Sequence, residues 1–327
     1  MSNWKKYYRW GKIIFFIYIG IGLTFYFLQD AILFHPVELA GNHQYDFKQT
    51  HEDISVPQDK TDTLNLIIFS SQGQIKKGAV LYFHGNKKNI DWYAKYIPQF
   101  TKNGYEVIMI DYPGFGKSKG ALTEQKLYDW ALQSYKIARK RFSADSIIIY
   151  GKSMGTGIAT ELASVRDCKA LVLETPYYDF PSVVSHYMPI YPVRWMLHYQ
   201  IPTFEFMKNV TAPITIFHGT DDGVINYSNS VKLSEYLYNI DRMMYQLKRS
   251  GKLDNLAGLI IGGFSDCKDM ERPFGKTVFE IIRDIVEEYN YPICYDFPVS
   301  HTAKNYALKI GQEYQLKIDS TGAVLAE

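Results

Sequence analysis

The chain has 327 residues, 46% of them hydrophobic and 21% charged, which is ordinary for a folded globular protein with one large domain or two smaller ones. A formal net charge of +2 gives no reason to expect binding to nucleic acid. Three cysteines are too few for a disulfide framework, and they have no C-x-x-C spacing, so we expect neither a zinc site nor a redox motif, and no cofactor.

The N-terminal segment combines basic residues with an apolar run. Lys5, Lys6, Arg9 and Lys12 precede an uncharged stretch over residues 13–28, and residues 31–34 are again apolar. As a helix, residues 13–34 reach roughly 30 Å, the thickness of a bilayer core. We therefore expect an uncleaved membrane anchor over residues 1–34, with a cleaved signal peptide as the alternative. The positive-inside rule then keeps the N-terminus cytoplasmic and carries the rest of the chain to the non-cytoplasmic side.

From residue 45 onward, short apolar runs alternate with amphipathic stretches. Consecutive apolar residues, many of them β-branched, are typical of strands that are buried on both faces of a parallel sheet. Such runs occur at residues 64–69, 79–83, 107–110, 147–150, 171–173 and 214–217. The stretches between them, such as residues 124–138, have helical periodicity. The order is therefore βαβα, and the predicted fold class is α/β.

Three loops directly follow predicted strands, at the sheet edge where an open parallel sheet places its active site. They are residues 84–86, 151–155 and 218–222. The second reads G-K-S-M-G and matches the nucleophile elbow G-x-S-x-G, so Ser153 is the predicted nucleophile. The backbone N–H groups of Met154 and Asn86 are the predicted oxyanion hole. Asp222 follows a later strand and is the predicted catalytic acid, in the chain order Ser…Asp…His.

Other interpretations of these loops are weaker. Ser153 could be a small residue in an ordinary strand–helix turn, but the companion loops argue against this. His84 and His218 each end a strand just before a glycine, where we expect the ring to bond to local backbone. The two G-K-S sequences do not form a P-loop, because Asp111 and Ser146 stand where its first glycine is required.

Residues 30–234 resemble the membrane-anchored α/β-hydrolases of the serine-aminopeptidase-like group, related to the Bem46-type proteins. The matching stretches are residues 81–86 (L-Y-F-H-G-N), 110–116 (I-D-Y-P-G-F-G), 149–157 (I-Y-G-K-S-M-G-T-G), 173–178 (L-E-T-P-Y-Y) and 217–222 (F-H-G-T-D-D). The resemblance implies a Ser-His-Asp esterase, thioesterase or peptidase without a metal, acting on a small acyl or peptide substrate. It also implies Asp222 rather than Asp221 as the acid, and a cap over residues 177–210.

The expected triad histidine is missing from its usual place. A triad needs a histidine to take the serine proton, and the family carries it about one strand and one loop after the acid. Residues 240–270 contain no histidine. His301 is the only histidine after Asp222, and it lies too far along the chain for that loop.

From about residue 235 the sequence is similar to the C-terminal part of an LD-carboxypeptidase, a serine peptidase family that trims murein peptides. The matching stretches are residues 238–242 (Y-N-I-D-R), 256–264 (L-A-G-L-I-I-G-G-F), 297–301 (F-P-V-S-H) and 305–308 (N-Y-A-L). The resemblance implies His301 as that family's catalytic histidine. Its glutamate is replaced, since Val231 and Lys232 stand where it belongs, and its serine lies in a half that this chain lacks. Apolar spacing predicts two helices in the tail and a hairpin across Gly311.

The sequence therefore predicts three parts. Residues 1–34 are a basic stub and anchor, residues 45–234 are an α/β-hydrolase domain without its final strand and histidine loop, and residues 235–327 are an LD-carboxypeptidase-like fragment. Two hypotheses follow for this chimera. It is a serine hydrolase whose activity depends on His301 reaching Ser153, or it is a catalytically incompetent fusion that at most binds acyl or peptide ligands.

Overall fold

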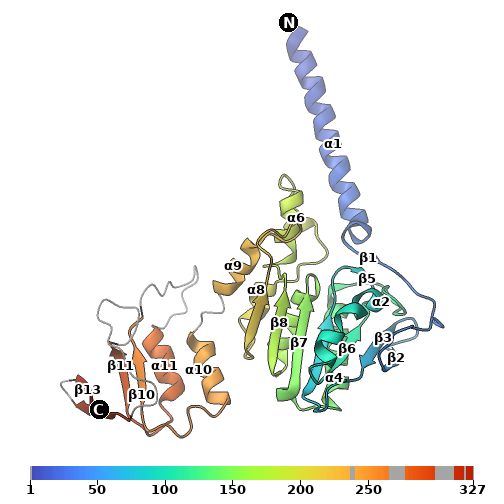
Figure 1. Cartoon of the computed structure of the whole chain (residues 1–327). Coiled ribbons are helices and arrows are strands. Elements are labelled where there is room, and N and C mark those ends of the chain that lie inside the picture. Colours follow the sequence, from blue (N-terminus) through green and yellow to red (C-terminus); the bar gives the residue numbers. More distant parts are fainter. Residues whose placement is uncertain (1, 236–239, 265–276, 299–312, 320–321, 327) are drawn as a thin grey trace. The chain divides into compact units, whose positions relative to one another are not determined.

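The computed structural model describes residues 2–235, 240–264, 277–298, 313–319 and 322–326 (Figure 1). It divides into two compact units, Met1–Tyr236 and Leu237–Glu327, each with its own sheet and hydrophobic core. His301 and the predicted turn at Gly311 lie outside the described residues.

A seven-stranded sheet forms the centre of the first unit, in the strand order β2-β3-β6-β4-β7-β8-β9 (Figure 1). The β2–β3 and β3–β6 pairs are antiparallel, and every pair from β6 to β9 is parallel. The strands are β2 His51–Pro57, β3 Thr63–Phe69, β4 Gly78–Phe83, β6 Tyr105–Ile110, β7 Ile147–Lys152, β8 Ala170–Glu174 and β9 Ile214–Phe217. This mixed, mostly parallel sheet confirms the predicted α/β class.

The central strands are apolar at consecutive positions because both faces of the sheet are covered. All six residues of β4 are buried, and so is all of β3 after its first residue. Strand β9 corrects our expectation of a doubly buried strand over residues 214–217. Its residues alternate in burial, Phe217 is 57% exposed, and no strand among the described residues pairs with its outer edge. Among the described residues, the sheet therefore ends at β9, whose outer edge is open.

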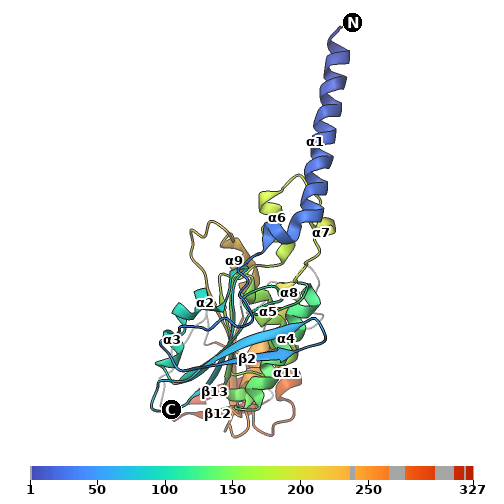
Figure 2. The ribbon, with the colours of Figure 1, turned by 90° about the vertical axis from the view of Figure 1, so that its right-hand side faces the viewer.

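Helices cover both faces of the sheet, with α2 (Ile90–Tyr93) and α3 (Pro98–Thr101) on one side and α4 (Glu124–Arg139) and α5 (Gly155–Val165) on the other (Figure 2). Helix α4 begins at Thr123, whose side chain accepts a hydrogen bond from the Lys126 N–H. Its buried face repeats at helical spacing and comprises Leu127, Trp130, Ala131, Ser134, Tyr135 and Ala138.

Helix α1 (Ser2–Leu33) precedes the sheet and is long and apolar enough, by length and composition, to cross a membrane. Only 11% of its most apolar window is buried. The chain leaves α1 through β1 (His35–Pro36), which pairs in parallel with β5 (Lys87–Lys88). The end of α1 is thus attached to the loop that follows β4.

The segment over residues 177–210 contains three short helices, α6 (Phe180–Tyr187), α7 (Val193–Met196) and α8 (Thr203–Met207). Helix α6 begins with a capping box between Asp179 and Ser182. The Arg194 guanidinium pairs with the Asp179 carboxylate and so joins α7 to the start of α6. After β9, helix α9 (Ser228–Glu235) closes the first unit.

The second unit contains α10 (Ile240–Arg249), β10 (Leu259–Gly262), α11 (Val278–Val286), β11 (Ile293–Phe297), β12 (Gln315–Asp319) and β13 (Gly322–Ala326). Strands β10 and β11 pair in parallel, and β12 and β13 form an antiparallel hairpin. The hydrophobic core of this second unit consists of Met244, Leu253, Ile261, Ile282, Ile285 and Val286. The predicted tail helices are both present, whereas the described hairpin joins 315–319 to 322–326.

Candidate active site

Ser153 stands at the sharp turn between strand β7 and helix α5. Its φ of 51° lies in the left-handed region, which a residue with a Cβ adopts only where its surroundings hold it there. The Ser153 N–H donates to the Glu174 carbonyl at 2.8 Å, and the Thr156 N–H and Oγ1–H donate to the Ser153 carbonyl at 2.9 and 2.6 Å. The strained turn is the backbone geometry that a nucleophile elbow requires.

The two glycines of the motif are needed because strand, helix and neighbouring strand approach closely. A Cβ on Gly155 would lie 2.1 Å from the Phe83 carbonyl oxygen, and a Cβ on Gly151 would lie 2.5 Å from the Gly155 oxygen. Both neighbours are backbone atoms, which cannot move aside as a flexible side chain can. The close packing at the two glycines therefore fixes the position of Ser153 relative to the sheet.

The predicted oxyanion donors lie on two segments beside Ser153. Met154 is the N-cap residue of α5, so its N–H stands at the helix end where backbone donors and the helix dipole favour negative charge. The loop after β4 also reaches the serine, because a Cβ on Gly85 would lie 3.5 Å from Ser153 Cβ. Asn86 follows in that loop. The structure thus places the Met154 end of α5 and the Gly85 loop next to Ser153.

Asn86 also holds the end of helix α1. The Asn86 side-chain Nδ2 donates to the Leu33 carbonyl at 2.6 Å, and the Asn86 carbonyl accepts from the His35 N–H at 2.9 Å. One hydrogen bond therefore joins the predicted oxyanion loop to the predicted anchor, and a second joins it to His35, directly after the anchor. Sequence reasoning did not foresee this link, because 53 positions separate Leu33 from Asn86.

His84 supports the loop that contains Gly85 and Asn86 through a bond to local backbone, as we expected for this ring. Its Nδ1 lies 2.7 Å from the Gly85 carbonyl oxygen, and a carbonyl can only accept, so Nδ1 carries the proton. Its Nε2 lies 3.3 Å from Asp111 Oδ1, and neither side chain is exposed. Burial raises the pKa of the Asp111 carboxyl. The pair is turned toward the core and is engaged in holding the loop.

Glu174, which sequence reasoning did not single out, braces the elbow from the neighbouring strand. It stands opposite Lys152 in the parallel register of β7 and β8. Its carboxylate accepts from the Lys152 ammonium and the Tyr150 hydroxyl, while its carbonyl accepts from the Ser153 N–H. One residue of β8 therefore contacts three residues of the elbow region, Tyr150, Lys152 and Ser153. In the sequence, Glu174 is visible only as part of the L-E-T-P-Y-Y stretch that resembles the α/β-hydrolases.

Asp222 lies in the loop after β9, where its carboxylate is largely used within the loop. Asp222 Oδ1 accepts from the N–H groups of Val224 and Ile225 at 2.8 and 2.9 Å. Asp222 Oδ2 lies 3.6 Å from His218 Nε2. His218 is not a free base, because its Nε2 donates to the Ile225 carbonyl at 2.9 Å and its Nδ1 bonds to Ser230 Oγ at 2.6 Å.

The structure brings Ser153, Met154 and the Asn86 loop together, and it places Asp222 in the loop after β9. His301 lies outside the described residues. Within residues 2–235 and the other described ranges, no hydrogen bond joins Ser153 to a histidine.

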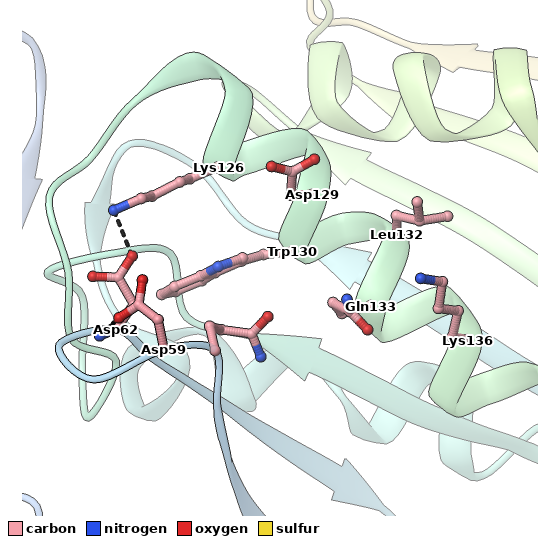
Figure 3. A pocket seen from close by; sticks show the side chains of 9 residues that line it. Asp59, Asp62, Lys126, Asp129, Trp130, Leu132, Gln133 and Lys136 are labelled. Atoms are coloured by element: carbon pink, nitrogen blue, oxygen red, sulfur yellow. Dashed lines mark hydrogen bonds and ion pairs between the residues drawn. The ribbon is translucent and has the colours of Figure 1, made fainter.

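A surface pocket of about 360 Å³ lies elsewhere on the first unit, between α4 and the β2–β3 turn (Figure 3). Figure 3 shows Lys126 reaching across to Asp62, with Asp59 beside it and Trp130 behind. None of the predicted site residues lines this pocket. In the part of the chain that the structure describes, no cluster of three or more His, Cys, Asp or Glu side chains could hold a metal ion.

Two family models match the chain. Residues 74–209 match the serine aminopeptidase S33 family, and residues 209–316 match the LD-carboxypeptidase C-terminal domain. Both resemblances drawn from the sequence are thereby confirmed. The second match begins at residue 209, before β9 and Asp222, whereas we expected that resemblance to begin near residue 235.

Curated relatives and solved structures are similar to part of the chain. Alpha/beta hydrolase domain-containing protein 17C of Xenopus tropicalis is 30% identical over 164 residues, which are 48% of this chain and 50% of the relative. The Mus musculus protein of the same name is 29% identical over 164 residues, 48% of each chain. The chain thus spans about half the length of these relatives. An esterase of Pyrococcus furiosus is 18% identical with a TM-score of 0.48, covering 62% of this chain and 83% of its own.

Proposed function

We propose that this chain, a member of the α/β-hydrolase family joined to an LD-carboxypeptidase C-terminal domain, is a serine hydrolase with Ser153 as its nucleophile. The observation that carries the proposal is the strained Ser153 turn, which Glu174 and Gly155 hold next to the Gly85 loop. An elbow serine serves esters, thioesters and peptide bonds alike, so the proposed substrate is a small acyl or peptide compound.

In the proposed reaction, Ser153 Oγ attacks the substrate carbonyl carbon while the hydroxyl proton passes to a base. The new C–O bond converts the carbonyl oxygen into an oxyanion, which the N–H groups of Met154 and Asn86 stabilise. The intermediate then expels its alcohol, thiol or amine, which takes the proton from the base, and an acyl group is left on Ser153. Water hydrolyses that ester by the same sequence of steps.

For the base we propose His301, oriented by Asp222. The support is the chain order Ser…Asp…His and the position of Asp222 at the end of a sheet strand. Asp222 Oδ2 is the carboxylate oxygen that the Val224 and Ile225 amides leave available. The proposal requires His301 to approach both Asp222 and Ser153 when the chain is active.

A second candidate function is a catalytically incompetent binding module. The observation that favours it is the loop of Asp222, where Oδ1 is taken up by two amides and the nearby His218 ring is bonded at both nitrogens. Without a base, Ser153 keeps its proton and attacks slowly. The elbow would then hold an acyl or peptide ligand without turning it over.

We also propose that α1 anchors the chain in a membrane, with the N-terminus on the cytoplasmic side and the hydrolase unit on the other. The support is its length and apolar composition together with the basic residues that precede the apolar run. Binding of nucleic acid forms no part of the proposed function, because the net charge is close to zero.

A fluorophosphonate probe tests the proposed function, because attack by Ser153 breaks its P–F bond and forms a stable phosphorus ester. We expect labelling of the full chain, no labelling of Ser153→Ala, and unchanged labelling of Ser164→Ala, a control near the end of helix α5. His301→Ala is expected to slow labelling by roughly 100-fold if His301 is the base. A wild-type chain that stays unlabelled would favour the binding module.

A further inference from the structure

The segment over residues 187–196, here named the cap tip, is docked against the side of helix α1. The Tyr18 and Tyr191 rings are stacked, with centroids 4.5 Å apart and planes within 3°. Each tyrosine hydroxyl also donates to the opposite backbone, Tyr18 to the Ile190 carbonyl at 3.0 Å and Tyr191 to the Tyr18 carbonyl at 2.9 Å. The contact is therefore specific in both its apolar and its polar parts.

Gln29 continues this contact toward the end of the helix. Its side chain is 1% exposed, its Nε2 donates to the Met196 carbonyl at 3.1 Å, and its Oε1 accepts from the His198 N–H at 2.8 Å. Gly22 lies between the two polar contacts, and a Cβ there would stand 3.1 Å from the Tyr191 ring. The cap tip thus follows α1 from Gln29 to Tyr18, about 16 Å along the helix axis.

The position of this contact has a consequence for any membrane that surrounds α1. Tyr18 lies about 22 Å along the axis from Leu33, and the apolar run begins only at Ile13. A bilayer core is roughly 30 Å thick, so it cannot cover the apolar run without also covering the level of the cap tip. Figure 2 shows α6 and α7 beside the C-terminal end of α1.

The cap tip has the composition of a segment that meets lipid. Its outward side chains include Ile190 at 71% and Trp195 at 86% exposure, two large apolar groups on one short segment that already contacts α1. Arg194 is its only charged residue, and the guanidinium is paired with Asp179. Tyr and Trp side chains are enriched where a protein crosses the membrane–water interface.

We propose that the cap tip enters the lipid bilayer together with α1, so that helix and tip form one membrane-embedded surface. Because the tip is continuous with the apolar side of α1, lipid is the partner that would cover the exposed side chains of Ile190 and Trp195. The surface lies close to the proposed active site, because Leu33 at the end of α1 is bonded to Asn86 of the oxyanion loop. The inference rests on the proposed anchor, and it does not require Ser153 to be active.

The test uses the full chain in phosphatidylcholine vesicles, with and without phosphatidylcholine brominated on its acyl chains. Bromine quenches only those tryptophans that reach the acyl region. The variant Trp195→Phe removes the tip tryptophan, and the control Trp92→Phe removes one that is 42% exposed on α2. We expect Trp195→Phe to lose at least a quarter of the bromolipid-quenched emission, and Trp92→Phe to keep all of it.

Flotation of the vesicles on a density gradient makes the outcomes distinct. If the chain floats and Trp195→Phe leaves the quenched emission unchanged, α1 is embedded but the tip is not, and the proposal is overturned. If Trp195 is shielded from both bromolipid and aqueous iodide, a protein surface covers the tip and the proposal is wrong. A chain that does not float overturns the inference together with the anchor. Ser153 labelling by the fluorophosphonate probe is measured separately and bears only on the proposed function.

Discussion

The His84 ring lies 3.3 Å from the Asp111 carboxylate, with both side chains fully buried directly behind the loop that reaches Ser153. The Nδ1 of this ring donates to the Gly85 carbonyl at 2.7 Å, while its Nε2 faces the Asp111 carboxylate, so the ring is held between the loop and the core. A fixed ring in turn fixes the loop. The buried pair therefore connects the core of the sheet to the proposed oxyanion hole.

Removing the ring should destabilise the first unit. His84→Ala leaves the Asp111 carboxyl buried without its neighbour, which costs about 1–3 kcal/mol on top of the lost packing. We expect the free energy of unfolding, measured in urea, to fall by about 3 kcal/mol. His186→Ala, which changes an exposed histidine on α6, should change it by less than about 0.5 kcal/mol. Equal losses in the two variants would contradict the supporting role of His84.

The close approach of Gly155 to the Phe83 carbonyl predicts that a substitution of Gly155 disturbs the elbow. In Gly155→Ala the new methyl group would stand 2.1 Å from the Phe83 carbonyl oxygen, so α5 or β4 must shift. We expect a loss of about 3 kcal/mol in unfolding free energy and loss of probe labelling at Ser153. The matched control is Gly41→Ala, where nothing lies within 4 Å of the added methyl group. A stable, normally labelled Gly155→Ala protein would show that the elbow tolerates more freedom than its contacts suggest.

Glu161 on α5 makes the stability of the chain depend on pH. Burial, followed by the nearby Asp129, raises the pKa of its carboxyl from 4.5 to about 7. The folded protein therefore binds this proton more tightly than the unfolded chain does. The resulting contribution to stability is present below pH 4.5 and is lost as the pH rises through about 7.

The variant Glu161→Gln should accordingly be more stable than wild type at pH 8. We expect a gain on the order of 1–2 kcal/mol, since the carboxyl is only partly buried and solvent screens it. At pH 4 the two proteins should unfold at similar urea concentrations. Glu205→Gln, an exposed change on α8, serves as the control. A difference of the same size at both pH values would contradict the titration of Glu161.

A variant of Asp222 distinguishes a structural role of its loop from a catalytic role. Asp222→Asn weakens the acceptor of the Val224 and Ile225 amides, which should cost about 1 kcal/mol of stability by itself. If Asp222 also orients a base, the rate of probe labelling should fall by roughly 100-fold or more, and His301→Ala should cause a similar fall. Unchanged labelling in Asp222→Asn would show that Asp222 stabilises its loop but does not orient a base.

Much of the first unit could be predicted from local patterns. Strands such as β4 are apolar at every position because both faces are covered, and the elbow is readable because only glycine fits at Gly155. Strand β2 escaped prediction because its residues are mostly exposed and carry no continuous apolar run. The exposure of Phe217 was unpredictable for a different reason, since the apolar pattern of β9 does not reveal whether another strand lies beyond it.

Long-range contacts account for the rest of what the sequence did not reveal. Gln29 looked like an interruption of the apolar run, yet its amide is buried against the backbone of Met196 and His198. Glu174 became visible as the brace of the elbow only through the register of β7 and β8. Both residues act on partners more than 20 positions away, where neither periodicity nor a short motif carries information.

The proposed function depends most directly on whether Ser153 works as a nucleophile in this chain. Incubation with p-nitrophenyl acetate, acid quenching and mass spectrometry of the peptide that contains residue 153 would measure it directly. We expect an acetyl group on Ser153 in the wild-type chain and none in Ser153→Ala. An unmodified Ser153 peptide, or acetylation that persists in Ser153→Ala, would contradict it.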